Sequence, residues 1–171
     1  MVGTAQKELL VRFVGSWKGR GDKEQDTQEF WSSLFHGMFG IAGLGDRVEF
    51  GKQVPLLDGQ CIDVFIPKTR VIILQESMDV DLLKRKKRSD GSELNSFEQA
   101  QRYGNRFPYS ERPRWIVTCN FQKFVVYDME DANPEERPVE ILLEELPDKY
   151  RLLSFLVDPA VDKIAVDETV V

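Results

Sequence analysis

Apolar residues recur along the chain with two spacings, one typical of amphipathic helices and one typical of strands. Near the N-terminus Leu9, Phe13 and Trp17 follow the helical spacing. Helices are predicted over four segments, residues 4–17, 26–38, 96–106 and 147–156. Ser96 and Gln99 suit a capping box at the start of the third segment. We therefore expect two helices before the first strand.

The remaining apolar runs are rich in β-branched residues and predict strands. They cover residues 47–54, 61–66, 70–74, 114–119, 124–129 and 139–143. The second and third runs flank the turn residues 67–69 and form a β-hairpin. The order of elements predicts an α/β fold with an α-β-β-β-α-β core, which is a mixed sheet flanked by helices, and an additional N-terminal helix and β-hairpin.

Composition fits one domain with its own core. The chain has 171 residues, 42% of them hydrophobic, and we expect a domain over residues 1–158 with 159–171 as a tail or the start of a linker. No apolar run reaches the length of a membrane span, so we expect a cytoplasmic protein in which Cys61 and Cys119 are reduced. The single His36 argues against a histidine-based catalytic device or zinc site.

Two carboxylates fall in or beside the central hairpin, where the neighbouring residues are apolar. Asp63 lies inside the first strand of the hairpin, and Glu76 follows the end of the second. A carboxylate among core residues costs desolvation energy unless it is paired, hydrogen-bonded or bound to a metal. Metal-dependent nucleases use such groups, so we expect Asp63 and Glu76 to bind Mg²⁺. Glu29 and Glu49 are further candidate acids, although a surface or capping role fits each of them better.

A short basic run interrupts an otherwise acidic chain. The net charge is −6, so contact with double-stranded DNA would need a local positive patch. The run follows the strand end that carries Glu76, and a second basic loop follows the first helix. One interpretation is a solvated loop, and the other is attraction of phosphate, which the position beside Glu76 favours. The candidate DNA-binding residues are Lys84, Arg85, Lys86, Lys87 and Arg88 in the run, and Lys18 and Arg20 in the loop.

Four long segments resemble one known protein family. They read WKGRGDKEQDTQEFW at 17–31, IDVFIPKTRVIILQES at 62–77, FEQAQRYGNRFPYSERPRWIVTCNFQKFVVYD at 97–128 and LLSFLVDP at 152–159. Over residues 12–159 the chain is similar to the N-terminal PD-(D/E)xK nuclease domain of single-chain restriction-modification enzymes of types IIG and IIL. These polypeptides join an endonuclease to an adenine-specific DNA methyltransferase.

The resemblance implies a bacterial, Mg²⁺-dependent DNA endonuclease domain that acts on double-stranded DNA. It also implies a helical spacer, a methyltransferase and a target-recognition domain elsewhere in the same polypeptide. S-adenosylmethionine would bind only in that other region, because this chain has neither a glycine-rich cofactor loop after a strand nor an Asn-Pro-Pro-aromatic motif. Gln99 and Tyr103 match a Gln-x-x-x-Tyr motif that the resemblance places beside the metal and the DNA.

Two positions of the family motif are replaced in this chain. Asp63 matches the first acid, but Leu74-Gln75-Glu76 stands where the family has Glu-x-Lys. A leucine cannot bind a cation, because Mg²⁺ requires oxygen ligands. A glutamate cannot supply the positive charge with which the lysine orients or activates water.

Three interpretations of this departure stay open from the sequence. In the first, the domain is an inactive nuclease that is kept for architecture or for DNA contact. In the second, Glu76 serves as the second metal acid, and a lysine of the basic run such as Lys84 enters the site. In the third, the two residues are substitutions particular to this sequence. We expect an N-terminal DNA endonuclease-like domain of a restriction-modification polypeptide, with Asp63, Glu76, Gln99 and Tyr103 as catalytic candidates. The alternative is an inactive DNA-binding or structural domain of a DNA adenine methyltransferase.

Overall fold

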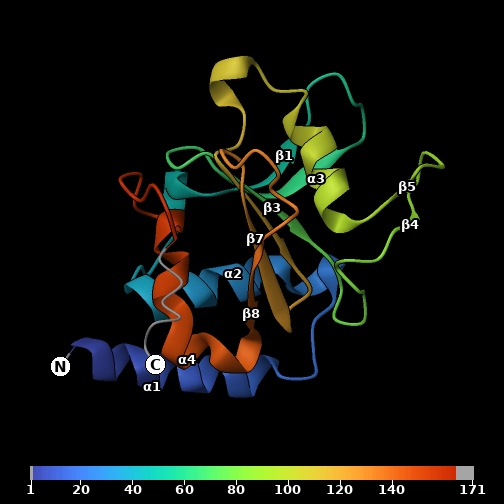
Figure 1. Cartoon of the computed structure of the whole chain (residues 1–171). Helices are drawn as coiled ribbons and strands as arrows, with labels where there is room; N and C mark the ends of the chain where they lie inside the picture. The colour runs from blue at the N-terminus through green and yellow to red at the C-terminus, as the bar shows by residue number, and fades with distance from the viewer. Residues whose placement is uncertain (1, 165–171) are drawn as a thin grey trace.

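Six strands form one mixed β-sheet, and helices cover both of its faces (Figure 1). The structure is a computed structural model that describes residues 2–164, with side chains from residue 5 onward. Along the sheet the strands follow the order β1 (Glu49–Gln53), β2 (Cys61–Ile66), β3 (Val71–Gln75), β6 (Trp115–Cys119), β7 (Lys123–Asp128) and β8 (Val139–Leu142). β3 and β6 pair in parallel, and the other neighbouring strands pair antiparallel.

The helices occur in the order that the sequence predicts. The α-helices are α1 (Val2–Trp17), α2 (Lys23–Phe39), α3 (Ser96–Gly104) and α4 (Leu146–Lys149). Short 3-10 helices cover Gly45–Arg47, Tyr109–Glu111, Leu143–Glu145 and Tyr150–Leu156. α3 makes the crossover that a parallel pair such as β3 and β6 requires, so the predicted α/β fold with an α-β-β-β-α-β core is confirmed. Within residues 2–164, no helix is both long enough and apolar enough to cross a membrane.

Each face of the sheet has its own apolar cluster. On one face, Trp31 of α2 packs in a cluster with Ile73 and Val117 of the central strands. On the other face, Phe97 of α3 packs in a cluster with Ile72. All residues of β3 and β6 are buried, because these strands lie in the centre of the sheet with helices on both sides. The burial continues through Glu76, the residue directly after β3.

α2 begins earlier than predicted, and its start is bound to the segment that follows β3. The Gln25 N–H donates to Asp22 Oδ1 (3.0 Å), so Asp22 caps the helix and the predicted start near residue 26 is wrong. The Lys23 N–H donates to the Ser77 hydroxyl (2.9 Å). The carbonyl of Gly21 accepts a hydrogen bond from the backbone of residue 78 (3.1 Å). These bonds bring Lys23 to the end of β3.

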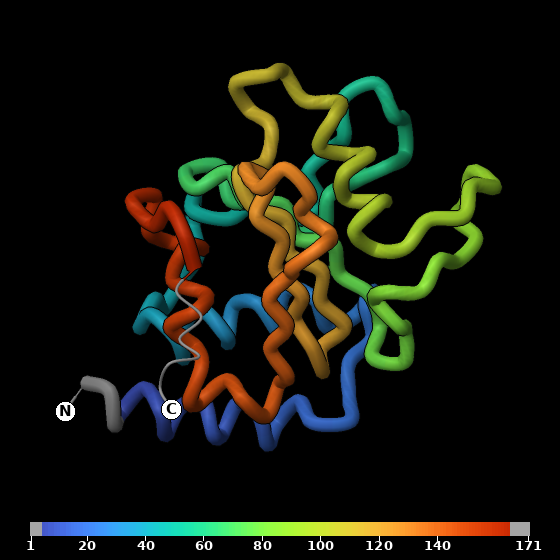
Figure 2. Tube along the Cα trace, viewed as in Figure 1, coloured from blue at the N-terminus to red at the C-terminus, as the bar shows by residue number. Residues whose placement is uncertain are grey.

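The segment between β3 and α3 contains a second, two-stranded sheet, which the sequence analysis did not predict. β4 (Lys86–Lys87) pairs antiparallel with β5 (Glu93–Leu94), and the hairpin extends away from the main sheet (Figure 2). α3 begins at Ser96 as predicted, but Asn95 and Glu98 form its capping box rather than Ser96 and Gln99. The side chain of Ser96 is thus free to bind another group.

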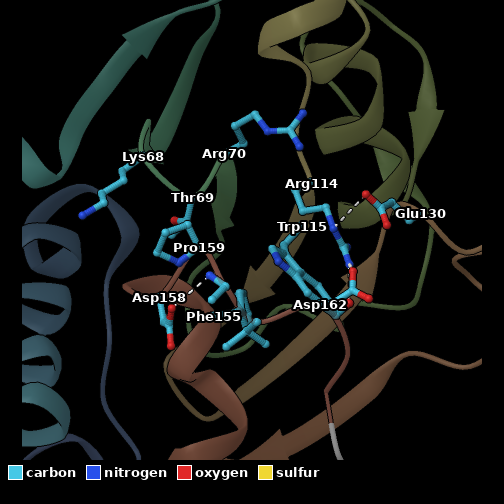
Figure 3. Close-up of a pocket in the computed structure, with 12 residues that line it drawn as sticks. Lys68, Thr69, Arg70, Arg114, Trp115, Glu130, Phe155, Asp158, Pro159 and Asp162 are labelled. Carbon is cyan, nitrogen blue, oxygen red and sulfur yellow. Dashed lines mark hydrogen bonds and ion pairs between the residues drawn. The ribbon is translucent and has the colours of Figure 1, made fainter.

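The last predicted helix is shorter than expected, and the chain after it folds back on the sheet. α4 has only four residues and continues as the 3-10 helix Tyr150–Leu156. Arg114, just before β6, pairs with Asp128 (2.6 Å), Glu130 (3.2 Å) and Asp162 (3.6 Å) beside a cavity of about 310 Å³ (Figure 3). Of the predicted tail, residues 165–171 lie outside the described residues.

An aromatic cluster holds the α1–α2 loop close to the sheet. The rings of Trp17 and Phe121 stack with centroids 5.7 Å apart, and Phe30 contacts both rings edge-on. Gly21 passes against Phe121 with φ of 144°, and a Cβ atom at this glycine would lie 2.2 Å from the ring. The loop that leads to Lys23 therefore requires a residue without a side chain at this position.

Gly21→Ala should destabilise the protein more than Gly19→Ala. Gly19 also has a positive φ (70°), but no atom lies within 4 Å of its added Cβ. Gly19→Ala then carries only the backbone strain, about 1–2 kcal/mol, whereas Gly21→Ala adds overlap with Phe121, about 1–3 kcal/mol more. Urea unfolding measures both free energies, and equal losses would contradict the tight packing of this loop.

Candidate functional site

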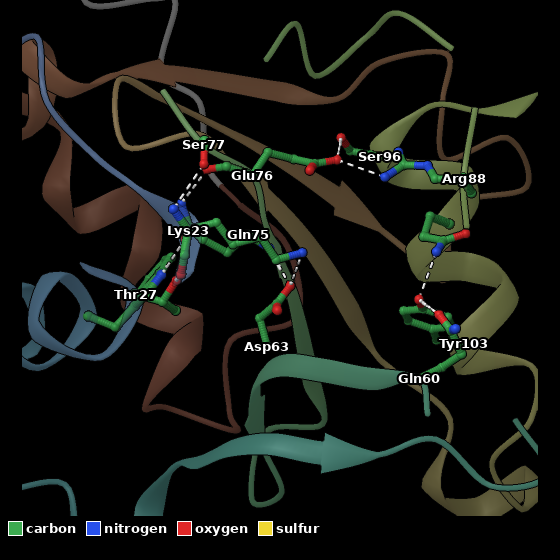
Figure 4. Close-up of polar contacts among 12 residues, drawn as sticks. Lys23, Thr27, Gln60, Asp63, Gln75, Glu76, Ser77, Arg88, Ser96 and Tyr103 are labelled. Atoms are coloured by element: carbon green, nitrogen blue, oxygen red, sulfur yellow. Dashed lines mark hydrogen bonds and ion pairs between the residues drawn. The ribbon is translucent and has the colours of Figure 1, made fainter. Parts of the chain in front are cut away.

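Asp63 lies where β2 separates from β3. The paired register of these two strands ends at Val64 and Ile73. Beyond that point the Gln75 N–H donates to Asp63 Oδ2 (2.8 Å), so the side chain replaces a backbone acceptor of β2. Lys23, at the start of α2, places its Nζ 3.6 Å from the same oxygen (Figure 4). Asp63 therefore connects the end of the strand pair to α2.

Burial raises the pKa of Asp63 above its ordinary value. The charge of Lys23 and the hydrogen bond from Gln75 act in the opposite direction, but they offset burial only in part. The negative charge of Glu76 adds to the rise. The ionised form of Asp63 is thus less favoured than it would be in water.

Glu76, directly after β3, is a buried carboxylate with three side-chain partners. Only 3% of its side chain is exposed. Lys86 Nζ lies 3.1 Å from Oε1, and Arg88 Nη1 lies 3.0 Å from Oε2. The hydroxyl of Ser96, the first residue of α3, donates to Oε2 (2.9 Å) (Figure 4). One carboxylate therefore connects β3, the β4–β5 hairpin and α3.

The three partners keep Glu76 ionised. Burial alone would raise the pKa of Glu76, but the hydrogen bonds from Ser96 and Lys86 and the charges of Lys86 and Arg88 lower it below its ordinary value. The pKa values of Glu76 and Asp63 are thus shifted in opposite directions. The two acids that the sequence predicts to share one metal ion have different environments.

Leu74 belongs to the apolar core. Leu74 and Glu76 lie on the α3 side of β3, as strand alternation predicts. Gln75 faces the other side and accepts a hydrogen bond from Trp31 Nε1 of α2 (2.7 Å). Leu74 packs in the cluster that contains Phe97 of α3. The position of the second family acid is therefore filled with hydrocarbon.

Gln99 and Tyr103 lie on one face of α3, as their spacing predicts. The Gln99 amide donates to the Tyr103 hydroxyl (2.7 Å), and this hydroxyl donates to Gln60 Oε1 just before β2 (2.6 Å). Burial raises the pKa of Tyr103, and the charge of Asp63 raises it further. The hydrogen bond to Gln60 connects the α3 pair to the start of β2, the strand that contains Asp63. Contact of the pair with DNA stays a prediction.

Lys86 and Arg88 are the members of the basic run that reach Glu76. They are two residues apart, so the alternation of an extended segment turns both toward the same side. If Glu76 serves as the second metal acid, a lysine of the basic run, such as Lys84, is expected to enter the site. In the structure Lys84 is exposed, and the lysine of the run that lies beside the Glu76 carboxylate is Lys86.

The other candidate DNA-binding residues lie outside this ion-pair cluster. Arg85 makes a bidentate contact with Glu98 at the start of α3, with Nε donating to Oε1 (3.0 Å) and Nη2 donating to Oε2 (2.6 Å). Three of the five cations in the basic run thus pair with carboxylates. The remaining candidates are exposed: Lys84, Lys87, Lys18 and Arg20.

The residues present do not fit Mg²⁺. The ion requires several oxygen ligands in octahedral geometry. Both oxygens of Glu76 already contact cationic groups, Asp63 Oδ2 is bound to Gln75 and paired with Lys23, and Leu74 supplies no oxygen. In the part of the chain that the structure describes, no group of three or more His, Cys, Asp or Glu side chains is placed to hold a metal ion.

Glu29 and Glu49, the additional acids considered from the sequence, are both exposed. Glu49 lies 4.0 Å from Lys52 on the same strand. A surface role therefore fits both residues better than a place in the site.

Three members of the site were missed from the sequence. Lys23 and Gln60 lie just outside the predicted helices and strands, where periodicity gives no information on neighbours. Ser96 was assigned to a capping box. One usable signal was Asp63 itself, because a carboxylate in an apolar strand requires a partner, and the basic loop before α2 offered one.

Glu76→Ala should lower the free energy of unfolding by about 3–5 kcal/mol, because it leaves the buried guanidinium of Arg88 without its counter-charge. The matched control is Glu93→Ala on the exposed side of β5, with a change within about 0.5 kcal/mol. Because the pKa of Glu76 is lowered in the fold, its contribution is present above the ordinary glutamate value and lost as the pH falls below it. Urea unfolding at several pH values tests this, and similar losses for both variants would contradict it.

Asp63→Asn should raise the melting temperature at pH 7, by roughly 2–4 °C for each kcal/mol of relieved desolvation. The amide oxygen still accepts the bond from Gln75, and the buried charge is removed. Because the pKa of Asp63 is raised, the wild-type protein regains stability as the pH falls through that pKa, and the advantage of the variant shrinks. Exposed Asp58 gives the control Asp58→Asn. A lower melting temperature for Asp63→Asn at pH 7 would show that ionised Asp63 is stabilising.

The protein-family model described as "MmeI, N-terminal domain" matches residues 5–169 of the chain. Comparisons with curated proteins and with solved structures found no match. The family match spans nearly the whole chain and confirms the resemblance inferred from the four sequence segments. The chain therefore belongs to the family of the MmeI N-terminal domain, the N-terminal nuclease domain of MmeI-type restriction-modification enzymes.

Proposed function

We propose that the chain is a DNA-contacting domain of a restriction-modification polypeptide, and that its β2–β3 site does not hydrolyse DNA with a metal ion. Membership of the family supports an interaction with DNA. The state of Glu76 supports the absence of metal-dependent hydrolysis. This is the second of the two functions considered from the sequence, in which the nuclease fold is kept without cleavage.

The observation that carries the proposal is the neutralisation of Glu76. Its two oxygens are bound by Lys86, Arg88 and Ser96, so the carboxylate is committed to the protein. Leu74 fills the place of the second acid. A metal ion entering here would have to displace two cations from a buried carboxylate and would still lack oxygen ligands.

The end of β3 is the place where the chain gathers positive charge. The α1–α2 loop contains Lys18 and Arg20, and Lys23 begins α2. The backbone of this region is hydrogen-bonded to the segment after β3. The β4–β5 hairpin extends from the same region (Figure 2). Lys87 on β4 and Lys84 just before it are exposed. Such a local cluster attracts DNA phosphates even though the net charge of the chain is −6.

Sequence specificity and methyl transfer would come from other parts of the polypeptide. The methyltransferase and target-recognition domains are part of this proposal, and S-adenosylmethionine would bind to the former. The present chain would hold the DNA backbone beside those domains.

Supercoiled plasmid incubated with Mn²⁺ and the unmodified chain should stay uncut, and a labelled duplex should bind with an affinity that falls as the salt concentration rises. Asp63→Ala is the control for a contaminating nuclease, because trace cleavage that persists in this variant does not come from the site. Cleavage by the unmodified chain that Asp63→Ala abolishes would overturn the non-hydrolytic part. Absence of salt-dependent duplex binding would overturn the DNA part.

A further inference from the structure

Cations outnumber carboxylates at the end of β3. Lys23, Lys86 and Arg88 contact the two acids Asp63 and Glu76, so the site has one positive charge in excess when both acids are ionised. A metal-dependent nuclease obtains positive charge at this place from its metal ion. In this chain the side chains of Lys23, Lys86 and Arg88 supply the positive charge.

Arg88 has a donor group without a partner. Its side chain is nine-tenths buried, with Nη1 on Glu76 Oε2 (3.0 Å) and Nε on the Leu94 carbonyl (3.1 Å). Its Nη2 group is buried and has no hydrogen-bond partner among the described residues. Buried donors are normally paired, and the oxygen of an anion is a strong partner for a guanidinium. An oxygen atom from outside the chain would complete this group.

Lys86 is the accessible member of the cluster. Its side chain is 43% exposed, compared with 9% for Arg88 and 3% for Glu76. One contact to Glu76 leaves ammonium donors free for a second acceptor. Arg88 stays beside Glu76 if Lys86 swings toward solvent, so the carboxylate keeps a counter-charge. An incoming anion would thus meet Lys86 first and Arg88 behind it.

We propose that Lys86 and Arg88 form a binding site for a DNA backbone phosphate, in which fixed side-chain cations take the place of the metal ion of the family. The site rests on the proposed function, because it specifies where and how this domain holds DNA. Binding requires no divalent cation. Glu76 modulates the site, since its oxygen atoms position both cations and its negative charge weakens their attraction for phosphate.

Fluorescence anisotropy with a short labelled duplex tests the site, using the whole chain in EDTA and in Mg²⁺. The affinity in EDTA should equal or exceed that in Mg²⁺. Lys86→Gln should weaken binding of every sequence and lower the slope of log K against log salt by about 1. Lys86→Arg should bind like the wild type. Lys68→Gln, in the turn at the opposite end of the β2–β3 hairpin, should bind unchanged.

Glu76→Gln gives the clearest distinction between a phosphate-binding site and a metal-binding site. The amide keeps the shape and removes one negative charge, so duplex affinity should rise, roughly five-fold. A metal ligand would give the opposite result, a loss of affinity that appears only with Mg²⁺. Circular dichroism and urea unfolding show whether each variant is folded, and Lys86, being half-exposed, gives variants that leave the core intact.

The outcomes distinguish the two proposals. If the duplex binds in a salt-dependent manner but Lys86→Gln and Glu76→Gln bind like the wild type, the phosphate site is wrong and the DNA-contacting function stands. If binding requires Mg²⁺, the replacement of the metal by side-chain cations is wrong. If no duplex binds to the folded chain, the proposed function itself is wrong.

Discussion

The buried charge of Glu76 is the interaction on which the rest of the site depends. A carboxylate with 3% of its side chain exposed is stable only when it is paired and hydrogen-bonded. Lys86, Arg88 and Ser96 meet this requirement, and they come from the β4–β5 hairpin and α3. The charge therefore fixes the position of a hairpin that has only a two-residue ladder of its own. Glu76, which stands where the resemblance places the motif lysine, thus stabilises the fold.

The two acids of the site have opposite roles. Asp63 is held at the edge of the strand pair by Lys23 and the Gln75 N–H, and burial disfavours its charge. Glu76 keeps its charge because its partners outweigh burial. The two positions at which this chain departs from the expected motif are both part of the fold, Leu74 in the apolar core and Glu76 in the ion-pair cluster. Reversing residues 74 and 76 alone to the family pattern would leave two cations facing a lysine, without the carboxylate that now neutralises them.

Local patterns in the sequence are sufficient for most of the fold. The apolar runs of β3 and β6 predict buried central strands, and the four-residue spacing of Gln99 and Tyr103 predicts their shared face. The partners of the acids were not predictable in this way. Lys23 meets Asp63 across forty residues of sequence, and Arg88 meets Glu76 only because a short hairpin turns it inward. Pairs of this kind are set by tertiary packing, and helical and strand periodicity give no information on such contacts.

The most direct test is anomalous diffraction from crystals of the chain grown with Mn²⁺. If side-chain cations have replaced the metal, no manganese peak lies between Asp63 and Glu76, and Lys86 and Arg88 remain in contact with the Glu76 carboxylate. A manganese ion bound by both acids, with Lys86 and Arg88 displaced from Glu76, would contradict the replacement and restore a metal-dependent nuclease site.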